Sequence, residues 1–502
     1  MNSVCLVITP SVFLLDERVF MSLGILRVAA VLESQGRPVE VLDLSGIENY
    51  EDVTRLHAAQ SRAACFGITA TTPQMPAAVK IAAAIRSVRP DARVILGGPH
   101  VTLVNAAAKR ERTDGLEGRA TGAMAILRRD FDVLVAGDGE KAISLALGQL
   151  PPAILDADEP KSPLFLTNAA LTQMPFPARH LVDVESYHYS IDGHRALSLI
   201  AQLGCPFECG FCGGRASPSL RRVRTRTSDN IIAEMTNLSQ QYGTTGFMFY
   251  DDELNVNREM VGLMRGIRDA QERLGVEWRL RGFIKAELFE DEQAAELYGA
   301  GFRWILVGFE SGSPRILENI NKKSTRDDNT RCIETATRHG LKVKALMSIG
   351  HPGESSDTVS DTHEWLIATR PADFDVSIIT TYPGTPYYDE ALRHDRLPDV
   401  WTYTYKKTGD RLHAYEVDFT RVAEYYKGDP DGGYQAYVFT DAMTSLELVD
   451  ARDRIERDVR AKLEIPFNPH ASALRYEHSM GQPGLLPGHI LRQSTIVGAQ
   501  AR

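Results

Sequence analysis

The run Gly204-Cys205-Pro206-Phe207-Glu208-Cys209-Gly210-Phe211-Cys212 brings three cysteines onto one short loop, in the spacing Cys-x3-Cys-x2-Cys. Thiolates are the usual ligands of iron–sulfur clusters, and soft sulfur donors favour such clusters or zinc. A structural zinc ion needs a fourth ligand at comparable spacing, and no Cys or His follows closely. Three ligands on a cubic cluster leave its fourth iron open to a second molecule. The spacing favours an iron–sulfur cluster on Cys205, Cys209 and Cys212; buried cysteines that cluster by chance are the other interpretation.

The size and composition are those of an ordinary soluble protein. A chain of 502 residues has room for about two to four domains. No apolar run approaches the ~20 residues of a membrane span, and the first residues lack the features of a signal peptide. Six cysteines in this length do not make a disulfide framework, so we expect a cytoplasmic protein. The net charge of −10 with scattered basic residues argues against a nucleic-acid partner, and we expect no membrane partner either.

Residues 1–150 alternate apolar strands with helical stretches. The expected strands are Val4–Thr9, Val39–Leu44, Ala64–Thr69, Val94–Leu96 and Val133–Ala136, and helices are expected over Gly24–Gln35 and near Pro76–Val88. This alternation predicts a parallel, doubly wound (Rossmann-like) sheet. We interpret residues 106–127 as a charged surface excursion.

Small and polar residues follow the strands of this first domain. They lie at Thr69–Thr72, Gly97–Thr102 and Gly137–Glu140, and ligands of doubly wound sheets bind at the carboxyl ends of strands. The candidate ligand-binding residues are Thr69, Thr71, Gly97, Gly98, His100, Gly137, Gly139 and Glu140. His100 could equally be a loop histidine with a structural partner.

The remaining chain is predicted to contain a linker, a barrel and a C-terminal domain. Prolines interrupt residues 151–195, which we interpret as a linker. Residues 196–395 carry six strand–helix units, with strands expected at Ala196–Gln202, Gly246–Tyr250, Trp278–Arg281, Trp304–Phe309, Val343–Ile349 and Ser377–Tyr382. They predict a partial (β/α)6 barrel, whose chemistry belongs at the carboxyl ends of its strands. Residues 396–502 are aromatic-rich and include an expected helix at Phe439–Leu463, and we interpret them as a mixed C-terminal domain.

Polar residues mark the strand ends of the expected barrel. They are Asp251-Asp252-Glu253, Arg281, Glu310-Ser311 and Gly350. Carboxylates there suit an ammonium group, because charge-assisted hydrogen bonds are strong. Asp251 and Asp252 could alternatively be a helix N-cap and a solvated carboxylate. The other cysteines, Cys5, Cys65 and Cys332, are expected in the core.

Together these motifs resemble the radical S-adenosylmethionine (SAM) superfamily, in the branch that carries an N-terminal cobalamin-binding domain. The resemblance covers about residues 1–395, and it implies that residues 396–502 are a C-terminal domain that closes the open side of the barrel and shapes the substrate site. It implies a [4Fe-4S] cluster on Cys205, Cys209 and Cys212. It implies SAM binding by Phe211, Asp251, Asp252, Glu253, Arg281, Glu310, Ser311 and Gly350, and cobalamin binding by the eight candidates of the first domain. Gly137-Asp138-Gly139-Glu140 stands where the family usually has Gly-Glu-Gly-Glu. The Asp-x-His-x-x-Gly motif is absent, so no histidine is expected to ligate cobalt.

The resemblance also implies a reaction. An electron from the cluster cleaves SAM to a 5′-deoxyadenosyl radical, which takes hydrogen from an unactivated carbon, and methylcobalamin then methylates that carbon. A small-molecule substrate of natural-product biosynthesis and an electron donor such as flavodoxin or ferredoxin are expected. The alternatives are a radical rearrangement, cyclisation or bond formation without methyl transfer, and transfer of the SAM aminocarboxypropyl group to a heteroatom. An Fe–S electron carrier or sensor would leave the SAM motifs without a role.

Overall fold

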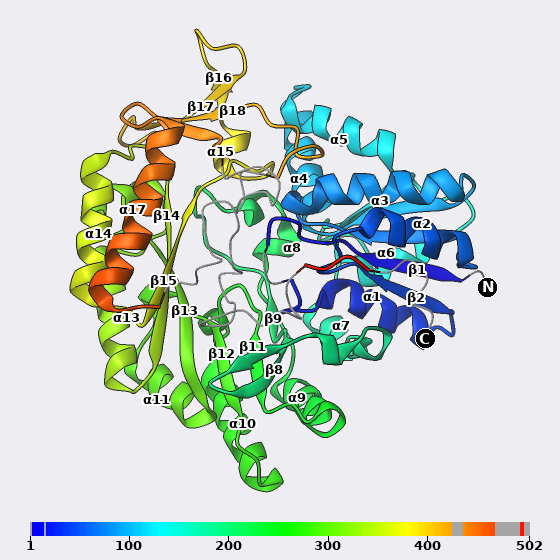
Figure 1. Cartoon of the computed structure of the whole chain (residues 1–502), viewed down its shortest axis with the longest axis horizontal. Coiled ribbons are helices and arrows are strands. Elements are labelled where there is room, and N and C mark those ends of the chain that lie inside the picture. Colours follow the sequence, from blue (N-terminus) through cyan, green and yellow to red (C-terminus); the bar gives the residue numbers. More distant parts are fainter. Residues whose placement is uncertain (1–2, 15–16, 424–434, 467–491, 496–502) are drawn as a thin grey trace.

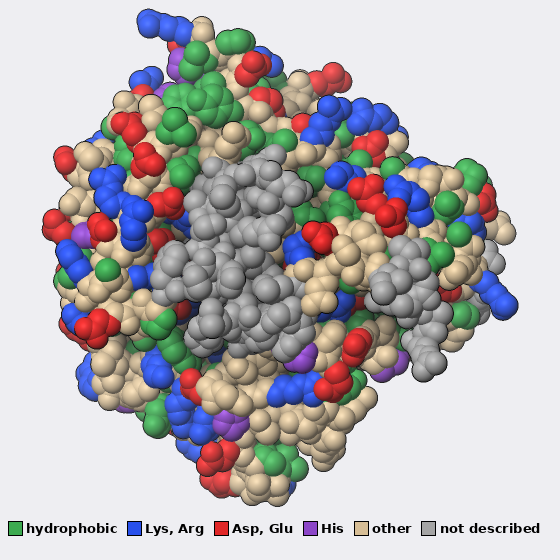
Figure 2. All heavy atoms as spheres, in the orientation of Figure 1, with side chains coloured by type: hydrophobic (Ala, Val, Ile, Leu, Met, Phe, Trp, Pro, Cys, Tyr) green, Lys and Arg blue, Asp and Glu red, His purple; other side chains and the backbone are tan. Residues whose placement is uncertain are grey.

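The computed structural model describes residues 3–14, 17–423, 435–466 and 492–495. Figure 1 shows two α/β bodies side by side, an N-terminal one (blue and cyan) and a larger one (green and yellow), with a small antiparallel sheet above their junction. Among the described helices, none is both long and apolar enough to cross a membrane. On the face seen in Figure 2, blue Lys and Arg side chains are interspersed with red Asp and Glu.

The N-terminal body is a six-stranded parallel sheet in the order β2-β1-β3-β4-β5-β6. Its strands are β1 (Val4–Ile8), β2 (Val39–Asp43), β3 (Cys65–Thr69), β4 (Arg93–Gly97), β5 (Val133–Gly137) and β6 (Ile154–Ala157). Helices α1 (Leu23–Ser34) and α6 (Gly139–Ala146) pack on one face. Helices α2 (Tyr50–Gln60), α3 (Met75–Val88), α4 (Pro99–Thr113) and α5 (Arg119–Asp130) pack on the other. The predicted doubly wound fold is confirmed, and its strand order reverses between β1 and β3.

Two details of this domain differ from the prediction. Residues 106–127 are not a surface excursion, because α4 and α5 occupy most of this stretch. Ala106, Ala107 and Ala108 are buried, and alanine is the best helix former, so the charged residues around them only coat the outer side. The sheet also extends past residue 150, because β6 adds a sixth strand that the prolines of this region concealed.

The second body is a seven-stranded sheet in the order β15-β14-β13-β12-β11-β8-β7. Six strands are parallel: β8 (His194–Leu199), β11 (Gly246–Phe249), β12 (Arg279–Phe283), β13 (Phe302–Glu310), β14 (Lys342–Ile349) and β15 (Asp373–Ile378). Helices α9 (Ser228–Tyr242), α10 (Met260–Leu274), α11 (Asp291–Ala300), α13 (Arg326–Arg338) and α14 (Ser356–Thr369) contribute to the core on its outer face. The predicted partial (β/α)6 barrel is confirmed.

The barrel differs from the prediction at both edges. Its seventh strand, β7 (Tyr189–Ile191), lies within the predicted linker and pairs antiparallel with β8. At the other edge, β15 ends at Ile378, so the strand predicted at Ser377–Tyr382 is wrong in position. Phe374, Val376 and Ile378, every second residue of β15, lie on the outer face, and this spacing of two is the sequence signal of the strand.

The described C-terminal part adds a four-stranded antiparallel sheet of β16 (Leu392–Arg393), β17 (Val400–Thr404), β18 (Arg411–Tyr415) and β19 (Val438–Thr440). The predicted helix Phe439–Leu463 starts too early, because β19 precedes it and α17 spans Ser445–Leu463. Thr444 and Glu447 form a capping box that fixes this start. Helix α17 packs against the barrel edge strand β15.

Candidate active site

The cysteine loop leaves the end of β8 through β9 (Gln202–Leu203) and is fastened at several points. The Cys205 amide donates to Leu220 O at 2.9 Å, and the Gly210 amide donates to Ile320 O at 2.8 Å. Gly204 has φ +88°, and a Cβ there would lie 2.2 Å from Arg222 O, so only glycine fits. The loop is thus held in one shape at the carboxyl end of the barrel.

The thiols of this loop sit in surroundings that suit a cationic metal cluster. Burial raises the pKa of Cys205 to about 12 and that of Cys212 to about 11, so both are neutral thiols at pH 7 without a cation. Burial also raises the pKa of Cys209, although the ammonium groups of Lys322 and Lys285 oppose that rise. Bound metal ions deprotonate coordinating thiols outright. Three thiols from one fixed loop, with two cations beside them, fit an iron–sulfur cluster.

Lys285 and Lys322 were not among the residues predicted from the sequence. The Lys285 Nζ lies 4.3 Å from the centroid of the Phe207 ring and 2.8 Å from Glu287 Oε1. Lys285 stands two residues after the end of β12, so the rule that singled out other strand ends could have found it. Lys322 lies beyond α12 (Pro314–Asn319), where no sequence signal points to the site.

Asp251 and Asp252 brace the backbone that leads into the cysteine loop. One carboxylate oxygen of Asp251 accepts from the Ala201 amide at 2.7 Å and from the Gln202 amide at 3.0 Å. Asp252 accepts from the Gly204 amide at 2.9 Å. In the structure, therefore, these side chains hold the preceding strand end, and neither has the helix-capping role that was the alternative interpretation.

Two buried carboxylates at this strand end have unused oxygens. Within the described part of the chain, Asp251 Oδ2 and Glu253 Oε2 have no hydrogen-bond partner. Burial raises the pKa of each side chain to about 7. A buried polar atom without a partner is costly, so these oxygens are suited to a ligand with hydrogen-bond donors.

Glu310 anchors a polar network at the end of β13. It adopts φ +66°, and its two oxygens accept from Lys322 Nζ and Ser348 Oγ, both at 2.7 Å. Ser348 Oγ lies 2.8 Å from His351 Nε2, and His351 Nδ1 lies 3.3 Å from the Tyr387 hydroxyl. Burial opposes ionisation of Glu310, but Lys322 outweighs it and holds the pKa of Glu310 below its ordinary value. A non-glycine residue in this left-handed conformation is typical of functional sites.

The other residues predicted to bind SAM make contacts with neighbouring parts of the protein. Phe211 contacts His351 edge-on, with ring centroids 5.4 Å apart. The Gly350 amide donates to Glu354 at 3.0 Å. The Ser311 hydroxyl is used inside the protein, 3.0 Å from Thr362 Oγ1. Arg281 donates to the Tyr189 hydroxyl at 3.0 Å, beside the antiparallel edge of the sheet.

A cavity of about 700 Å³ lies between the two bodies. Its lining includes seven of the eight candidates in the first domain: Thr69, Thr71, Gly97, Gly98, Gly137, Gly139 and Glu140. From the barrel side it is lined by Gly204, Tyr250 and Asp252, next to the cysteine loop. The strand ends of both domains therefore face one space.

His100 does not line this cavity. It is buried at the start of α4, and its Nδ1 lies 3.1 Å from Thr72 Oγ1. Burial lowers the pKa of His100 to about 4, so it is neutral. This placement matches the structural alternative considered for His100.

Polar contacts join the cysteine-loop region to the first domain. Arg224 pairs with Asp138, which stands just before α6. Asp158 accepts from the Ser217 hydroxyl at 2.7 Å and from the Ser219 amide at 2.8 Å. These buried contacts fix the distance between the cavity wall and the cysteine loop.

The chain matches two families and several individual proteins. Residues 17–128 match the B12 binding domain, and residues 199–366 match the radical SAM superfamily. An uncharacterized methyltransferase of Pyrococcus horikoshii is 27% identical over 66% of this chain and 70% of its own length. Bacteriochlorophyllide d C-12(1)-methyltransferase of Chlorobaculum tepidum is 28% identical over 46% of this chain; the match spans 52% of that enzyme.

The fold matches a solved structure of the same architecture. The radical SAM methyltransferase TsrM of Kitasatospora setae, solved with cobalamin and a [4Fe-4S] cluster bound, superposes with a TM-score of 0.63. It is 18% identical, and the match covers 94% of this chain and 93% of TsrM. This chain therefore carries a B12-binding domain ahead of a radical SAM domain.

Proposed function

We propose that this protein is a cobalamin-dependent radical SAM enzyme that methylates an unactivated carbon of a small molecule. The observation that carries the proposal is the cavity of about 700 Å³, since strand ends of both domains line it. A B12-binding domain and a radical SAM domain on opposite walls suit a reaction that uses both cofactors. The similarity to two methyltransferases supports methyl transfer over the other radical reactions.

The bound groups would supply the reactive chemistry: the cluster an electron that cleaves SAM, and cobalamin a transferable methyl group. The chain's own residues hold and orient these groups. Cys205, Cys209 and Cys212 would hold the cluster, while Asp252 fixes the backbone before the first of them. Lys285 and Lys322 place positive charge beside the cysteine loop, which offsets the negative charge that thiolates bring.

The SAM site is proposed at the strand ends beside the cysteine loop. Asp251 and Glu253 have oxygens free to accept hydrogen bonds from the SAM ammonium or ribose. Glu310 contributes charge, with its orientation fixed by Lys322 and Ser348. The side chains of Ser311 and Arg281 are hydrogen-bonded to Thr362 and Tyr189, so we assign both a structural role in this proposal.

The cobalamin site is proposed on the strand ends of the N-terminal sheet. Thr69, Thr71, Gly97 and Glu140 line the cavity there, and a Cβ at Gly97 would meet Val135 only at an ordinary contact distance of 3.8 Å. The lining residues of the described chain include no histidine. We therefore propose that no imidazole coordinates the cobalt, as the absent Asp-x-His-x-x-Gly motif also indicates.

Glu253→Gln should weaken SAM binding about tenfold or more, while the cluster is retained. The reason is that a hydrogen bond to a charged group is worth roughly 1.5–3 kcal/mol, and 1.4 kcal/mol corresponds to a factor of ten in affinity. Equilibrium binding of SAM to the reconstituted protein measures this. Ser311→Ala is the matched control, because its hydroxyl is bound to Thr362 and the Ser313 amide. Equal SAM affinity in Glu253→Gln and the native protein would refute the proposed pocket.

Product analysis tests the function itself. The anaerobically reconstituted protein is given SAM carrying a labelled methyl group, hydroxocobalamin, and a flavodoxin or ferredoxin reducing system. We expect S-adenosylhomocysteine and 5′-deoxyadenosine by mass spectrometry, with label recovered on the corrin. 5′-Deoxyadenosine without S-adenosylhomocysteine would replace methyl transfer by a rearrangement or cyclisation. Methylthioadenosine would indicate aminocarboxypropyl transfer. If no SAM-derived product forms, the result would favour an Fe–S electron carrier over an enzyme.

A further inference from the structure

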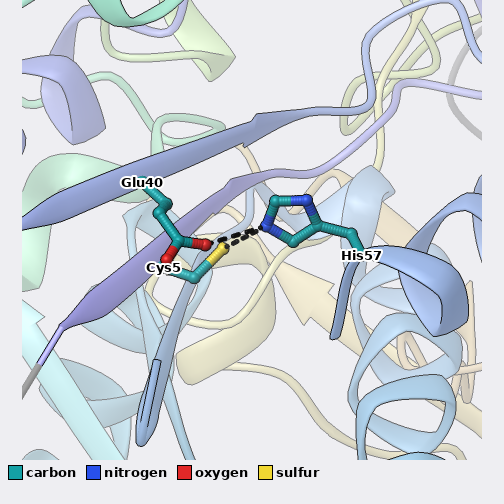
Figure 3. A group of neighbouring side chains, drawn as sticks. All are labelled: Cys5, Glu40 and His57. Atoms are coloured by element: carbon teal, nitrogen blue, oxygen red, sulfur yellow. Dashed lines mark hydrogen bonds and ion pairs between the residues drawn. The ribbon is translucent and has the colours of Figure 1, made fainter. Parts of the chain in front are cut away.

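A second group of metal-ligating side chains lies in the N-terminal domain, outside the site described above. Cys5 of β1, Glu40 of β2 and His57 of α2 point toward one another (Figure 3). Cys5 and Glu40 stand near the starts of β1 and β2, whereas the carboxyl ends of the N-terminal strands line the cavity. Among the residues that the structure describes, this is the one group of three His, Cys, Asp or Glu side chains whose ligand atoms lie within 4.8 Å of one another.

The distances in this group match those between ligands of a tetrahedral zinc ion. His57 Nε2 lies 3.4 Å from Cys5 Sγ and 3.3 Å from Glu40 Oε2. Zinc bonds of about 2.3 Å to sulfur and about 2.0–2.2 Å to nitrogen or oxygen, at tetrahedral angles, separate such ligand atoms by roughly 3.3–3.6 Å. Two of the three separations therefore suit one ion, and the ligand atoms of Cys5 and Glu40 lie within 4.8 Å of each other.

Hydrogen bonding alone explains this convergence poorly. Both Sγ of Cys5 and Oε2 of Glu40 approach the same nitrogen, His57 Nε2. An imidazole nitrogen carries either one proton or one lone pair, so it makes one in-line hydrogen bond. Two ligand atoms that crowd one nitrogen are better accommodated around a cation that all three contact.

The surroundings also suit a metal site. Glu40 accepts from the Ser61 hydroxyl at 2.7 Å and from the Ser3 hydroxyl at 3.3 Å, and such outer contacts orient metal ligands. The Cys5 side chain is buried, whereas the side chains of His57 and Glu40 are 31% and 34% exposed. The site is thus closed on the sheet side and open to solvent on the other, which leaves room for a water ligand and a route for the ion.

We propose that Cys5, Glu40 and His57 bind one zinc ion, with water as the fourth ligand. A thiolate, an imidazole and a carboxylate together favour zinc over magnesium or calcium, which prefer oxygen ligands. Because β2 is the edge strand of the sheet, the ion would tie this edge to β1 and to α2. The site does not depend on the function proposed for the cavity.

Zinc titration of the cluster-loaded full-length protein tests this proposal. The protein is first reconstituted with its full iron content, so that the loop cysteines are occupied. It is then treated briefly with chelator, desalted and titrated with zinc. Zinc retained per chain after gel filtration is then measured by plasma mass spectrometry. We expect one zinc ion per native chain, and at least tenfold weaker binding in Cys5→Ala, Glu40→Gln and His57→Gln. Zinc should raise the melting temperature of the native protein and leave that of the variants unchanged.

The controls separate a built site from adventitious zinc. Cys65→Ala removes another buried strand cysteine, one outside this group, and should bind zinc as the native protein does. If Cys5→Ala unfolds the domain, Glu40→Gln and His57→Gln still test the site, because they change partly exposed side chains and preserve the fold. The proposal is overturned if the cluster-loaded native protein retains no zinc. It is equally overturned if His57→Gln and Glu40→Gln retain zinc as tightly as the native protein.

Discussion

Replacing Cys205, Cys209 or Cys212 by Ala should abolish both the iron–sulfur absorbance and the cleavage of SAM. In the proposed site each side chain supplies one thiolate from a loop that is fixed by Leu220 and Ile320, so no neighbouring cysteine can take its place. Burial raises the pKa values of Cys205 and Cys212, so each of these thiols by itself is a poor metal ligand. Iron content, visible absorbance and 5′-deoxyadenosine formation after anaerobic reconstitution measure the effect.

The matched controls for this experiment are Cys65→Ala and Cys332→Ala. Both side chains are buried on elements outside the loop, Cys65 on β3 and Cys332 on α13, and neither should affect the cluster. A complete four-iron cluster in any of the three loop variants would refute the assignment. Loss of the cluster in both controls would show instead that the assay reports general unfolding.

Much of the fold could be predicted because the strands are regular in sequence. The first five strands of the N-terminal sheet and the first five of the barrel are found close to their expected positions, since each is a short apolar run before small or polar residues. The errors occur where a local signal was outweighed. Residues 106–127 carry many charges, yet the buried alanines of α4 decide their structure. β6 and β7 follow proline-rich or polar stretches and are strands only because a neighbouring strand pairs with them.

The candidate site could be predicted less completely than the fold. Spacing along the chain pointed to the cysteine loop, because its candidate ligands are neighbours in sequence. Lys322 meets Glu310 only through the turn beyond α12, and such a contact depends on tertiary packing. The same is true of Ser311 and Arg281, whose polar groups are bound by partners from other elements. Ser311 follows β13 as expected, but the prediction that Arg281 ends its strand is wrong, because β12 continues to Phe283.

The junction between the domains follows from a few buried polar contacts. Arg224 reaches Asp138 across the junction, and Asp158 binds the turn at Ser217 and Ser219. Breaking one partner of a buried ion pair is costly, about 3–5 kcal/mol, because the other charge stays buried. The junction is therefore rigid beside the cysteine loop, which would keep a ligand on the N-terminal sheet at a fixed distance from the cluster.

Gly97→Leu should weaken cobalamin binding roughly ten- to a hundredfold without unfolding the domain. Gly97 lines the cavity, and a Cβ there meets nothing closer than Val135 at 3.8 Å, so a larger side chain extends into the space proposed for the corrin. Overpacking typically costs about 1–3 kcal/mol, which corresponds to this loss of affinity. The ratio of bound corrin to iron after reconstitution and gel filtration measures it.

Other glycines explain why Gly97 is the position to test. Gly98 has φ +101°, and a Cβ there would lie 2.8 Å from Thr69 Oγ1, so its substitution would strain the backbone whether or not cobalamin binds. Gly262→Leu on α10 is the matched control, because it adds the same side chain where no atom lies within 4 Å. We expect Gly262→Leu to bind the full complement of corrin. Full corrin binding by Gly97→Leu, with its cluster intact, would move cobalamin out of this cavity and remove the basis for methyl transfer between the two domains.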